Sequence, residues 1–147
     1  MTTVKITSNG TLVKTVVTKD GVVLDDVVGL RLYFEPGIAQ VACEMNYLEE
    51  GRLKRWTGVN EGDAFEFTMS AEHDGTIYDV CASTSSDKTS SLGLHASVGN
   101  EQQGYSVMVP IFRGASVVLD LMAEGFSLQA SAKCELKASP ELELTHV

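Results

Sequence analysis

The residue types that most often carry catalysis or bind metal are few and scattered in this chain. Its three histidines stand at positions 73, 95 and 146, and no HxH, HxxxH or CxxC spacing occurs. Zinc sites usually group their ligands in such spacings. GxSxG, GxGxxG and a glycine loop followed by Lys-Ser or Lys-Thr are also missing. We therefore expect no enzyme activity, no metal and no cofactor.

One group of oxygen and nitrogen ligands does lie close together along the chain. His73, Asp74 and Asp79 flank the start of an expected strand and could gather around a calcium ion. Calcium takes about six to eight oxygen ligands, which is more than this group supplies. Asp74 is also followed by Gly75, and Asp-Gly is typical of tight turns. We interpret the segment as a turn.

His95 offers a second hypothesis, because a histidine can activate a serine or cysteine nucleophile that the fold brings within hydrogen-bond reach. It lies between Leu94 and Ala96 in an alternating run. A serine-rich β protein offers many such pairings on paper, and spacing alone selects none of them. We interpret His95 as a strand histidine that faces solvent.

The segment Arg52-Leu53-Lys54-Arg55-Trp56 stands out because it is basic and aromatic in an acidic chain. Trp and Arg are enriched at the energetic centres of protein interfaces. Arg52, Lys54, Arg55 and Trp56 are therefore the candidate protein-binding residues, as a patch that docks on the acidic face of another subunit. In the alternative interpretation, Trp56 caps the core and its basic neighbours stay solvated.

The elements that must position these residues are strands. Apolar and polar residues alternate along most of the chain, and sustained helical periodicity is missing. Residues 1–46 predict four strands, punctuated by the turn dipeptides Asn9-Gly10, Asp20-Gly21 and Pro36-Gly37. The segment between the first two dipeptides predicts the second strand, and Val22–Phe34 the third. The fourth covers residues 38–45.

Residues 47–62 contain three glycines and charge clusters without a sustained period, which predicts a connection or an excursion at a sheet edge. Residues 63–147 resume the strand pattern, with six strands and a further one in the tail. Together these segments predict an all-β, antiparallel sandwich or barrel of jelly-roll type. Residues 1–46 are a hairpin region that forms either a small N-terminal subdomain or one compact domain with 63–147.

Charge and composition exclude several classes of partner. The formal net charge is −9, so the mean field of the protein repels nucleic acid and anionic lipid surfaces. No apolar run is long enough for a membrane span. The opening residues MTTVKITSNG show no basic region followed by an apolar stretch, so we expect no secretion signal. The odd set Cys43, Cys81 and Cys134 lies in apolar or alternating runs. We expect buried, reduced thiols, with a disulfide as the alternative.

The first third of the chain carries a recognisable series of motifs. V-x-I-T-S-N-G-T starts at Val4, K-D-G-x-x-L-D-D-V-x-x-L at Lys19 and P-G-x-A-x-V at Pro36. Over residues 1–48 this series resembles small orphan β-rich proteins of tailed bacteriophages. The resemblance implies a phage origin and a place in the virion, as a capsid decoration, tail or accessory component assembled in the host cytoplasm.

The expected function is therefore that of a virion structural protein whose partners are copies of itself or other virion proteins. One alternative is a soluble phage-encoded inhibitor whose acidic surface covers a basic site on a host defence protein. A carbohydrate-binding sandwich is the other. Sugar platforms usually expose several aromatic rings, and this chain has one Trp and four Tyr, spread thinly.

Overall fold

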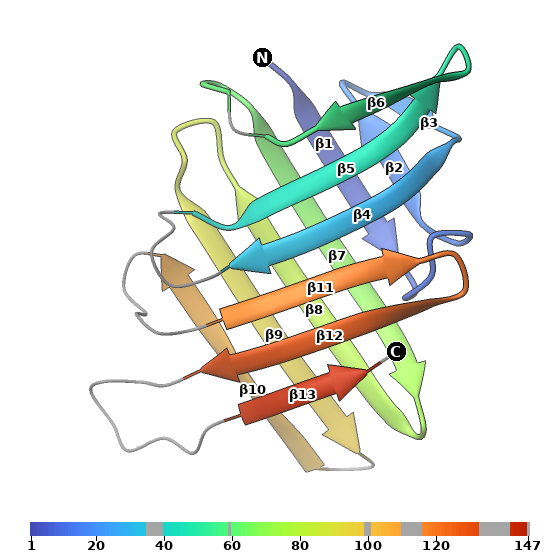
Figure 1. The fold of residues 1–147 in the computed structure, drawn as a ribbon. Helices are drawn as coiled ribbons and strands as arrows, with labels where there is room; N and C mark the ends of the chain where they lie inside the picture. The colour runs from blue at the N-terminus through green and yellow to red at the C-terminus, as the bar shows by residue number, and fades with distance from the viewer. Residues whose placement is uncertain (35–39, 59, 99–100, 110–115, 133–141, 147) are drawn as a thin grey trace.

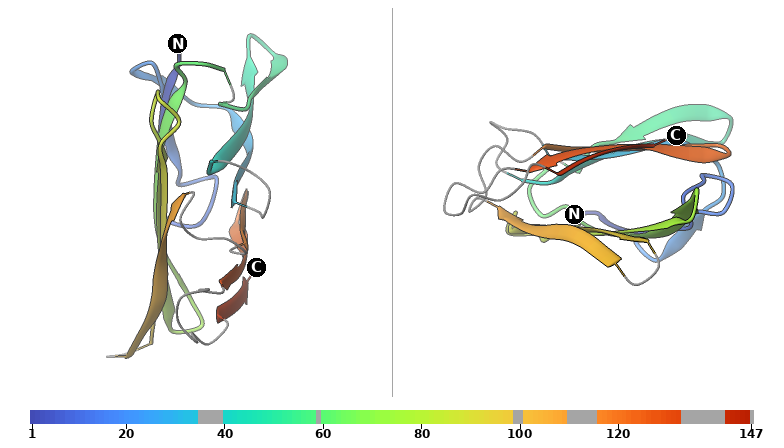
Figure 2. Two further views of the ribbon diagram at one scale, coloured as in Figure 1. Left: turned by 90° about the vertical axis from the view of Figure 1, so that its left-hand side faces the viewer. Right: turned by 90° about the horizontal axis from the view of Figure 1, so that it is seen from below.

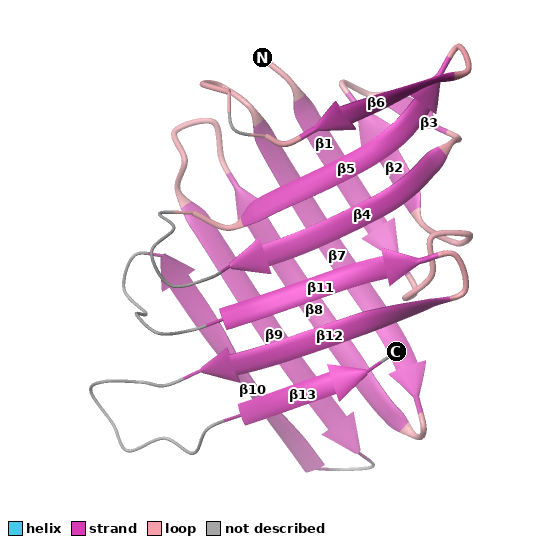
Figure 3. Cartoon of the chain, in the orientation of Figure 1, coloured by secondary structure: helices cyan, strands magenta, loops and turns pink. Residues whose placement is uncertain are grey.

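A computed structural model of the chain describes residues 1–34, 40–58, 60–98, 101–109, 116–132 and 142–146. Of residues 98, 101–109, 130–132 and 142–146, only the backbone is described. These residues form thirteen β-strands in two sheets (Figure 1). No helix occurs among them (Figure 3), and hence none that is long and apolar enough to cross a membrane.

The larger sheet has seven strands in the spatial order β10-β9-β8-β7-β1-β2-β3. Neighbouring strands are antiparallel except β1 and β7, which run parallel. This parallel pair departs from the expected antiparallel order. It forms because the chain leaves β3 for the other sheet and then returns beside β1, which supplies the long connection that parallel strands need. The bounds are β1 (Thr3–Ser8), β2 (Val16–Lys19), β3 (Val22–Leu24), β7 (Ala64–His73), β8 (Thr76–Thr84), β9 (Ser90–Val98) and β10 (Glu101–Val109).

The smaller sheet has six antiparallel strands in the order β13-β12-β11-β4-β5-β6. The two sheets lie face to face as separate layers, and their strands run in crossing directions (Figures 1 and 2). The expected all-β sandwich is confirmed. The bounds are β4 (Val27–Phe34), β5 (Ala42–Glu49), β6 (Arg52–Trp56), β11 (Ser116–Met122), β12 (Gly125–Ala132) and β13 (Leu142–His146).

The core lies between the sheets and is filled by every second residue of each strand. On β7, for example, Phe65, Phe67 and Met69 are buried while Glu66 and Thr68 are exposed. Each large apolar side chain buried in this way contributes about 1.5–3 kcal/mol. The largest fully buried side chains are Phe67, Ile6, Leu32, Met45, Met69, Leu92, Leu94, Leu119, Leu128, Val4, Val17 and Val41.

Three hairpins close with two-residue turns in which both residues have positive φ, the geometry that matches the twist of the flanking strands. Asp20-Gly21 has φ of 51° and 82°, and Asp74-Gly75 has 51° and 81°. Both turns were predicted from their dipeptides and are confirmed. The third, Glu50-Gly51 with φ of 53° and 75°, joins β5 to β6 and was not predicted.

The expected tight turn at Asn9-Gly10 is wrong, because residues 9–15 form a longer loop. Gly10 has a φ of 104°, and a Cβ there would lie 2.7 Å from the Cβ of Ala71. Glycine is therefore needed for a close approach to the core. The backbone N–H of Leu12 donates to the carbonyl of Met122 at 2.8 Å, so the loop bridges to the other sheet instead of folding back on β1.

The expected single strand over Val22–Phe34 is two strands in different sheets. The chain bends at Asp25-Asp26 and crosses from β3 to β4. The segment 47–62 also contains more regular structure than a connection, because β5 continues to Glu49 and β6 forms the edge of the smaller sheet. The dipeptide Pro36-Gly37 lies outside the described residues.

Residues 1–46 supply strands to both sheets: β1, β2 and β3 to the larger, β4 and most of β5 to the smaller. The strands expected after residue 63 correspond to β7 to β12, and the tail strand to β13. A turn was expected at residues 100–104, but residues 101–104 belong to β10, which begins at Glu101.

A candidate protein-binding edge

The basic segment singled out in the sequence is the edge strand β6, at the end of the smaller sheet (Figure 1). It pairs antiparallel with β5, with Trp56 opposite Met45 and Arg52 opposite Glu49. No described strand lies on its other side. The backbone N–H and C=O groups that point away from β5 are therefore available to another strand.

Trp56 is anchored in the core. Its side chain is 8% exposed, and its ring meets that of Phe65 edge-on, with centroids 6.5 Å apart and an interplanar angle of 85°. The indole Nε1 has no hydrogen-bond partner among the described residues. This placement corrects the expectation of Trp56 as a contact residue and agrees with the alternative, in which it closes one end of the core.

The connection that follows β6 holds the Trp56 ring in place. Gly58 has a φ of 67°, and a Cβ there would lie 2.8 Å from Cη2 of the indole, so the backbone packs directly on the ring. The Nζ of Lys88 donates to the carbonyl oxygens of Gly58 at 3.1 Å and Asp63 at 2.9 Å. The loop between β8 and β9 thereby fixes the connection between β6 and β7.

The three cations of β6 are exposed, as expected, but strand alternation divides them between two faces. Leu53 and Arg55 point outward from the sandwich. Arg52 and Lys54 point to the side on which Trp56 enters the core, but they lie beyond its rim. The cations therefore line both faces of a free edge, with Leu53, 66% exposed, between them.

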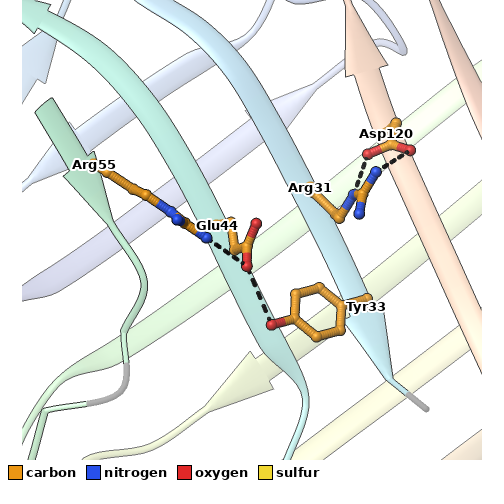
Figure 4. Close-up of polar contacts among 5 residues, drawn as sticks. All are labelled: Arg31, Tyr33, Glu44, Arg55 and Asp120. Carbon is orange, nitrogen blue, oxygen red and sulfur yellow. Dashed lines mark hydrogen bonds and ion pairs between the residues drawn. The ribbon is translucent and has the colours of Figure 1, made fainter. Parts of the chain in front are cut away.

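Arg55 belongs to a network of polar contacts on the outward face of the smaller sheet (Figure 4). Its guanidinium lies 2.9 Å from Oε1 of Glu44, which also accepts from the hydroxyl of Tyr33 at 3.4 Å. Nearby, Arg31 Nε donates to Oδ1 of Asp120 at 2.6 Å. Such exposed pairs contribute about 1 kcal/mol or less each, so they organise the face more than they stabilise the fold.

Arg52 and Lys54 differ from Arg55, because neither makes an ion pair with any residue that the structure describes. Both are exposed at the free edge. They are the positive charges of β6 that an acidic partner can reach without displacing an internal pair.

His73 and Asp74 close the β7–β8 hairpin, as the turn interpretation predicted. The His73 Nε2 lies 3.3 Å from an Asp74 oxygen, and its ring meets Phe126 with centroids 6.5 Å apart. Asp79 lies further along β8, opposite Ser70. Within the described ranges no group of three His, Cys, Asp or Glu residues is placed to share a metal ion.

His95 faces outward from the larger sheet, in a row of residues that crosses three strands. Asp79 lies between it and Ser70 in the register. A catalytic serine needs the histidine beside it, whereas two strand spacings, about 10 Å, separate Ser70 from His95. Cys81 lies opposite Gly93 and so only diagonal to His95, at a Cβ separation of about 7–8 Å. Neither Ser70 nor Cys81 therefore lies within hydrogen-bond reach of His95.

The cysteines divide between the core and the surface. Cys43 is buried, and burial with the adjacent Glu44 charge raises the pKa of its thiol from 9.0 to about 12. Cys81 is a free thiol but exposed, which corrects the expectation that it is buried. In β8 the core takes Tyr78, Val80 and Ala82, so the alternate position 81 points outward. Cys134 lies outside the described residues.

The larger sheet also borders a groove of about 510 Å³ at the ends of β1, β7 and β8. Several of its hydroxyls are already engaged: Thr84 donates to the Val41 carbonyl at 2.8 Å, and Ser83 lies 3.1 Å from Ser91. Its charged members, Lys5 and Glu66, are direct neighbours in the register. The lining is Met1, Thr3, Val4, Lys5, Gly62, Ala64, Phe65, Glu66 and Ser83 to Ser86.

A carbohydrate-binding surface needs exposed aromatic rings, and the described surface offers few of them. Among the Phe, Tyr and Trp side chains that the structure describes, Tyr33 is the one that is not buried, and it is half-buried. The buried ones are Phe34, Tyr47, Trp56, Phe65, Phe67, Tyr78 and Phe126. The described surface therefore presents no row of rings on which a sugar could stack.

Comparison of the chain with protein-family models, curated proteins and solved structures found no match. The functional proposal consequently rests on the geometry and charge of the chain itself.

Proposed function

We propose that this chain is a non-enzymatic structural protein of a bacteriophage virion, a capsid decoration or tail component, which acts through protein–protein contacts at the β6 edge. The observation that carries the proposal is the exposure of Arg52 and Lys54 on a free edge strand, in a chain whose net charge is −9. Cations of this kind steer an acidic partner to one place on an otherwise repulsive surface.

The edge strand supports a docking role in two further ways. Its free backbone groups can extend the sheet into a partner, a recognised mode of protein association. Trp56 and the Gly58 connection hold the strand rigidly, so little conformational entropy is lost when a partner binds. The resemblance of residues 1–48 to small phage proteins supports the virion as the assembly in which this edge is used.

Mass spectrometry of purified particles tests the proposal. We expect the chain in every particle preparation, in a fixed ratio to the major capsid or tail protein. The variant Arg52→Glu with Lys54→Glu should enter particles several-fold less well, because its edge repels an acidic partner. Lys14→Glu, which reverses an exposed charge in the loop between β1 and β2, should enter normally.

The inhibitor alternative is favoured by a different surface. Glu66, Glu72 and Asp79 are exposed on the outward face of the larger sheet, where they can cover a basic site. In that case the chain is absent from purified particles and is recovered in complex with a soluble host protein, which would overturn the virion proposal.

A further inference from the structure

The sandwich has a second free edge whose charge is opposite to that of β6. β3 ends the larger sheet, and no described strand lies beyond it. Asp25 and Asp26, both exposed, follow it directly. Val22 and Val23 on this edge are 65% and 54% exposed. An exposed apolar edge strand is a template for pairing with another chain unless something covers it.

We propose that the β6 edge of one copy pairs antiparallel with the β3 edge of a second copy. The inference rests on the same β6 edge as the proposed function and names its partner. Each edge matches the other in character, because both combine exposed apolar side chains with charge, and the charges are of opposite sign.

The free backbone groups of the two edges limit the register of this pairing. In β6, Arg52 and Lys54 bond to β5, which leaves the N–H and C=O groups of Leu53 free. In β3, the residues on either side of Val23 bond to β2, which leaves the groups of Val23 free. An antiparallel pair forms only between residues whose groups point at each other, so Leu53 lies opposite Val23, and two exposed apolar side chains meet.

The cations lie near carboxylates in this register. Arg52 is diagonal to Asp26 and Lys54 is diagonal to Asp20, and opposite charges on neighbouring strands stabilise a sheet. A shift by one residue in either direction turns the free groups of one strand away from the other, so no ladder forms. A shift by two places Leu53 opposite Asp25, where an apolar side chain faces a charge.

The contact is necessarily between unlike edges. Pairing β6 with β6 would bring the Arg52 and Lys54 side chains of both copies together, and pairing β3 with β3 would do the same for Asp25 and Asp26. Like charges directly opposite each other destabilise a sheet. Since every copy carries both edges, it can bind a neighbour on each side, which builds a ring or an open string of copies.

Sedimentation velocity of the full chain, over a concentration series at fixed ionic strength, tests the pairing. We expect wild type to form larger species as its concentration rises. Arg52→Glu and Asp26→Lys should each weaken association about five- to tenfold. The neutral variants Arg52→Gln and Asp26→Asn should weaken it less. An equimolar mixture of Arg52→Glu and Asp26→Lys should recover association, because the intact basic edge of one variant meets the intact acidic edge of the other.

Matched controls separate this contact from general charge effects. Lys14→Glu and Glu72→Lys make the same charge changes at exposed positions outside β3 and β6 and should associate like wild type. A wild type that stays monomeric throughout, or edge and control variants that behave alike, would overturn the pairing. If a monomeric chain is nevertheless found in particles and the β6 variants are not, the virion proposal stands without the self-pairing. If the chain associates but is absent from particles, the pairing stands and the virion proposal falls.

Discussion

The ring of Trp56 on β6 packs edge-on against the ring of Phe65 on β7, so the edge strand of the smaller sheet is fastened to the interior of the larger one. The same strand therefore does two things. Its last residue closes the core, while Arg52 to Arg55 remain exposed at a free edge. A firm anchor beside an exposed edge keeps that edge in a defined position for a partner.

Replacing Trp56 with Ala should reduce the free energy of unfolding by about 3–5 kcal/mol, because it removes the largest side chain at this end of the core and leaves a cavity. Leu53→Ala on the same strand should change it by about 0.5 kcal/mol or less, since Leu53 is exposed. Urea unfolding followed by far-ultraviolet circular dichroism measures both. Equal effects of the two substitutions would mean that Trp56 is not packed as described.

Gly58→Ala should destabilise the fold more than Gly51→Ala. Both glycines have positive φ, 67° and 75°, so both substitutions carry a backbone cost of about 1–2 kcal/mol. A Cβ at position 58 also meets the Trp56 ring at 2.8 Å, whereas at position 51 nothing lies within 4 Å. Urea unfolding gives the difference. It should be accompanied by a shift in the fluorescence of the single tryptophan in Gly58→Ala alone.

Stability should fall at alkaline pH through Cys43. Its thiol has a pKa of about 12 in the folded protein against an ordinary value of 9.0, so the folded state keeps a proton that the unfolded state loses. The protonated thiol makes its full contribution to the free energy of unfolding below pH 9. This contribution is lost as the pH rises toward 12, with a slope of up to about 1.4 kcal/mol per pH unit. Urea unfolding measures this. Between about pH 8.5 and 10.5, the free energy of unfolding should fall by about 2 kcal/mol less in Cys43→Ala than in wild type. Cys81→Ala should keep the wild-type slope.

Thiol labelling should distinguish the two described cysteines by rate. Cys81 is exposed and should react rapidly with a small maleimide, whereas Cys43 should react only when the core opens. Mass spectrometry of digests after brief labelling locates the product. Modification of Cys43 as fast as of Cys81 would show that the core near β5 is open.

Local chemistry made much of the fold predictable. Alternation identified most strands because each has one face on the core, and Asp20-Gly21 and Asp74-Gly75 identified two hairpins because both positions require positive φ. Glu50-Gly51 adopts the same geometry, but Glu-Gly is a weaker turn signal than Asp-Gly, so the sequence does not predict its hairpin. The following strand was missed as well, because only Trp56 of β6 is buried and the strand shows no alternation.

The sequence predictions that were wrong concern segments whose structure depends on contacts with residues far away in the sequence. Val22–Phe34 is equally strand-like throughout, and the crossing at Asp25-Asp26 follows from which sheet each half joins. Asn9-Gly10 has the composition of a tight turn, but Gly10 packs on Ala71. At the candidate site, the types of Arg52, Lys54 and Arg55 indicated exposure correctly. The burial of Trp56 depends on Phe65 and Gly58, which spacing does not reveal.

Hydrogen–deuterium exchange of the segment 51–57 most directly tests the use of β6 as a contact. In the dilute isolated chain, the amides of the free edge should exchange quickly, since they point to solvent. In purified particles we expect exchange of this segment to slow many-fold, because a partner occupies the edge. The buried strand β7 should change little. Equally fast exchange of 51–57 in the isolated chain and in particles that contain it would contradict the β6 contact.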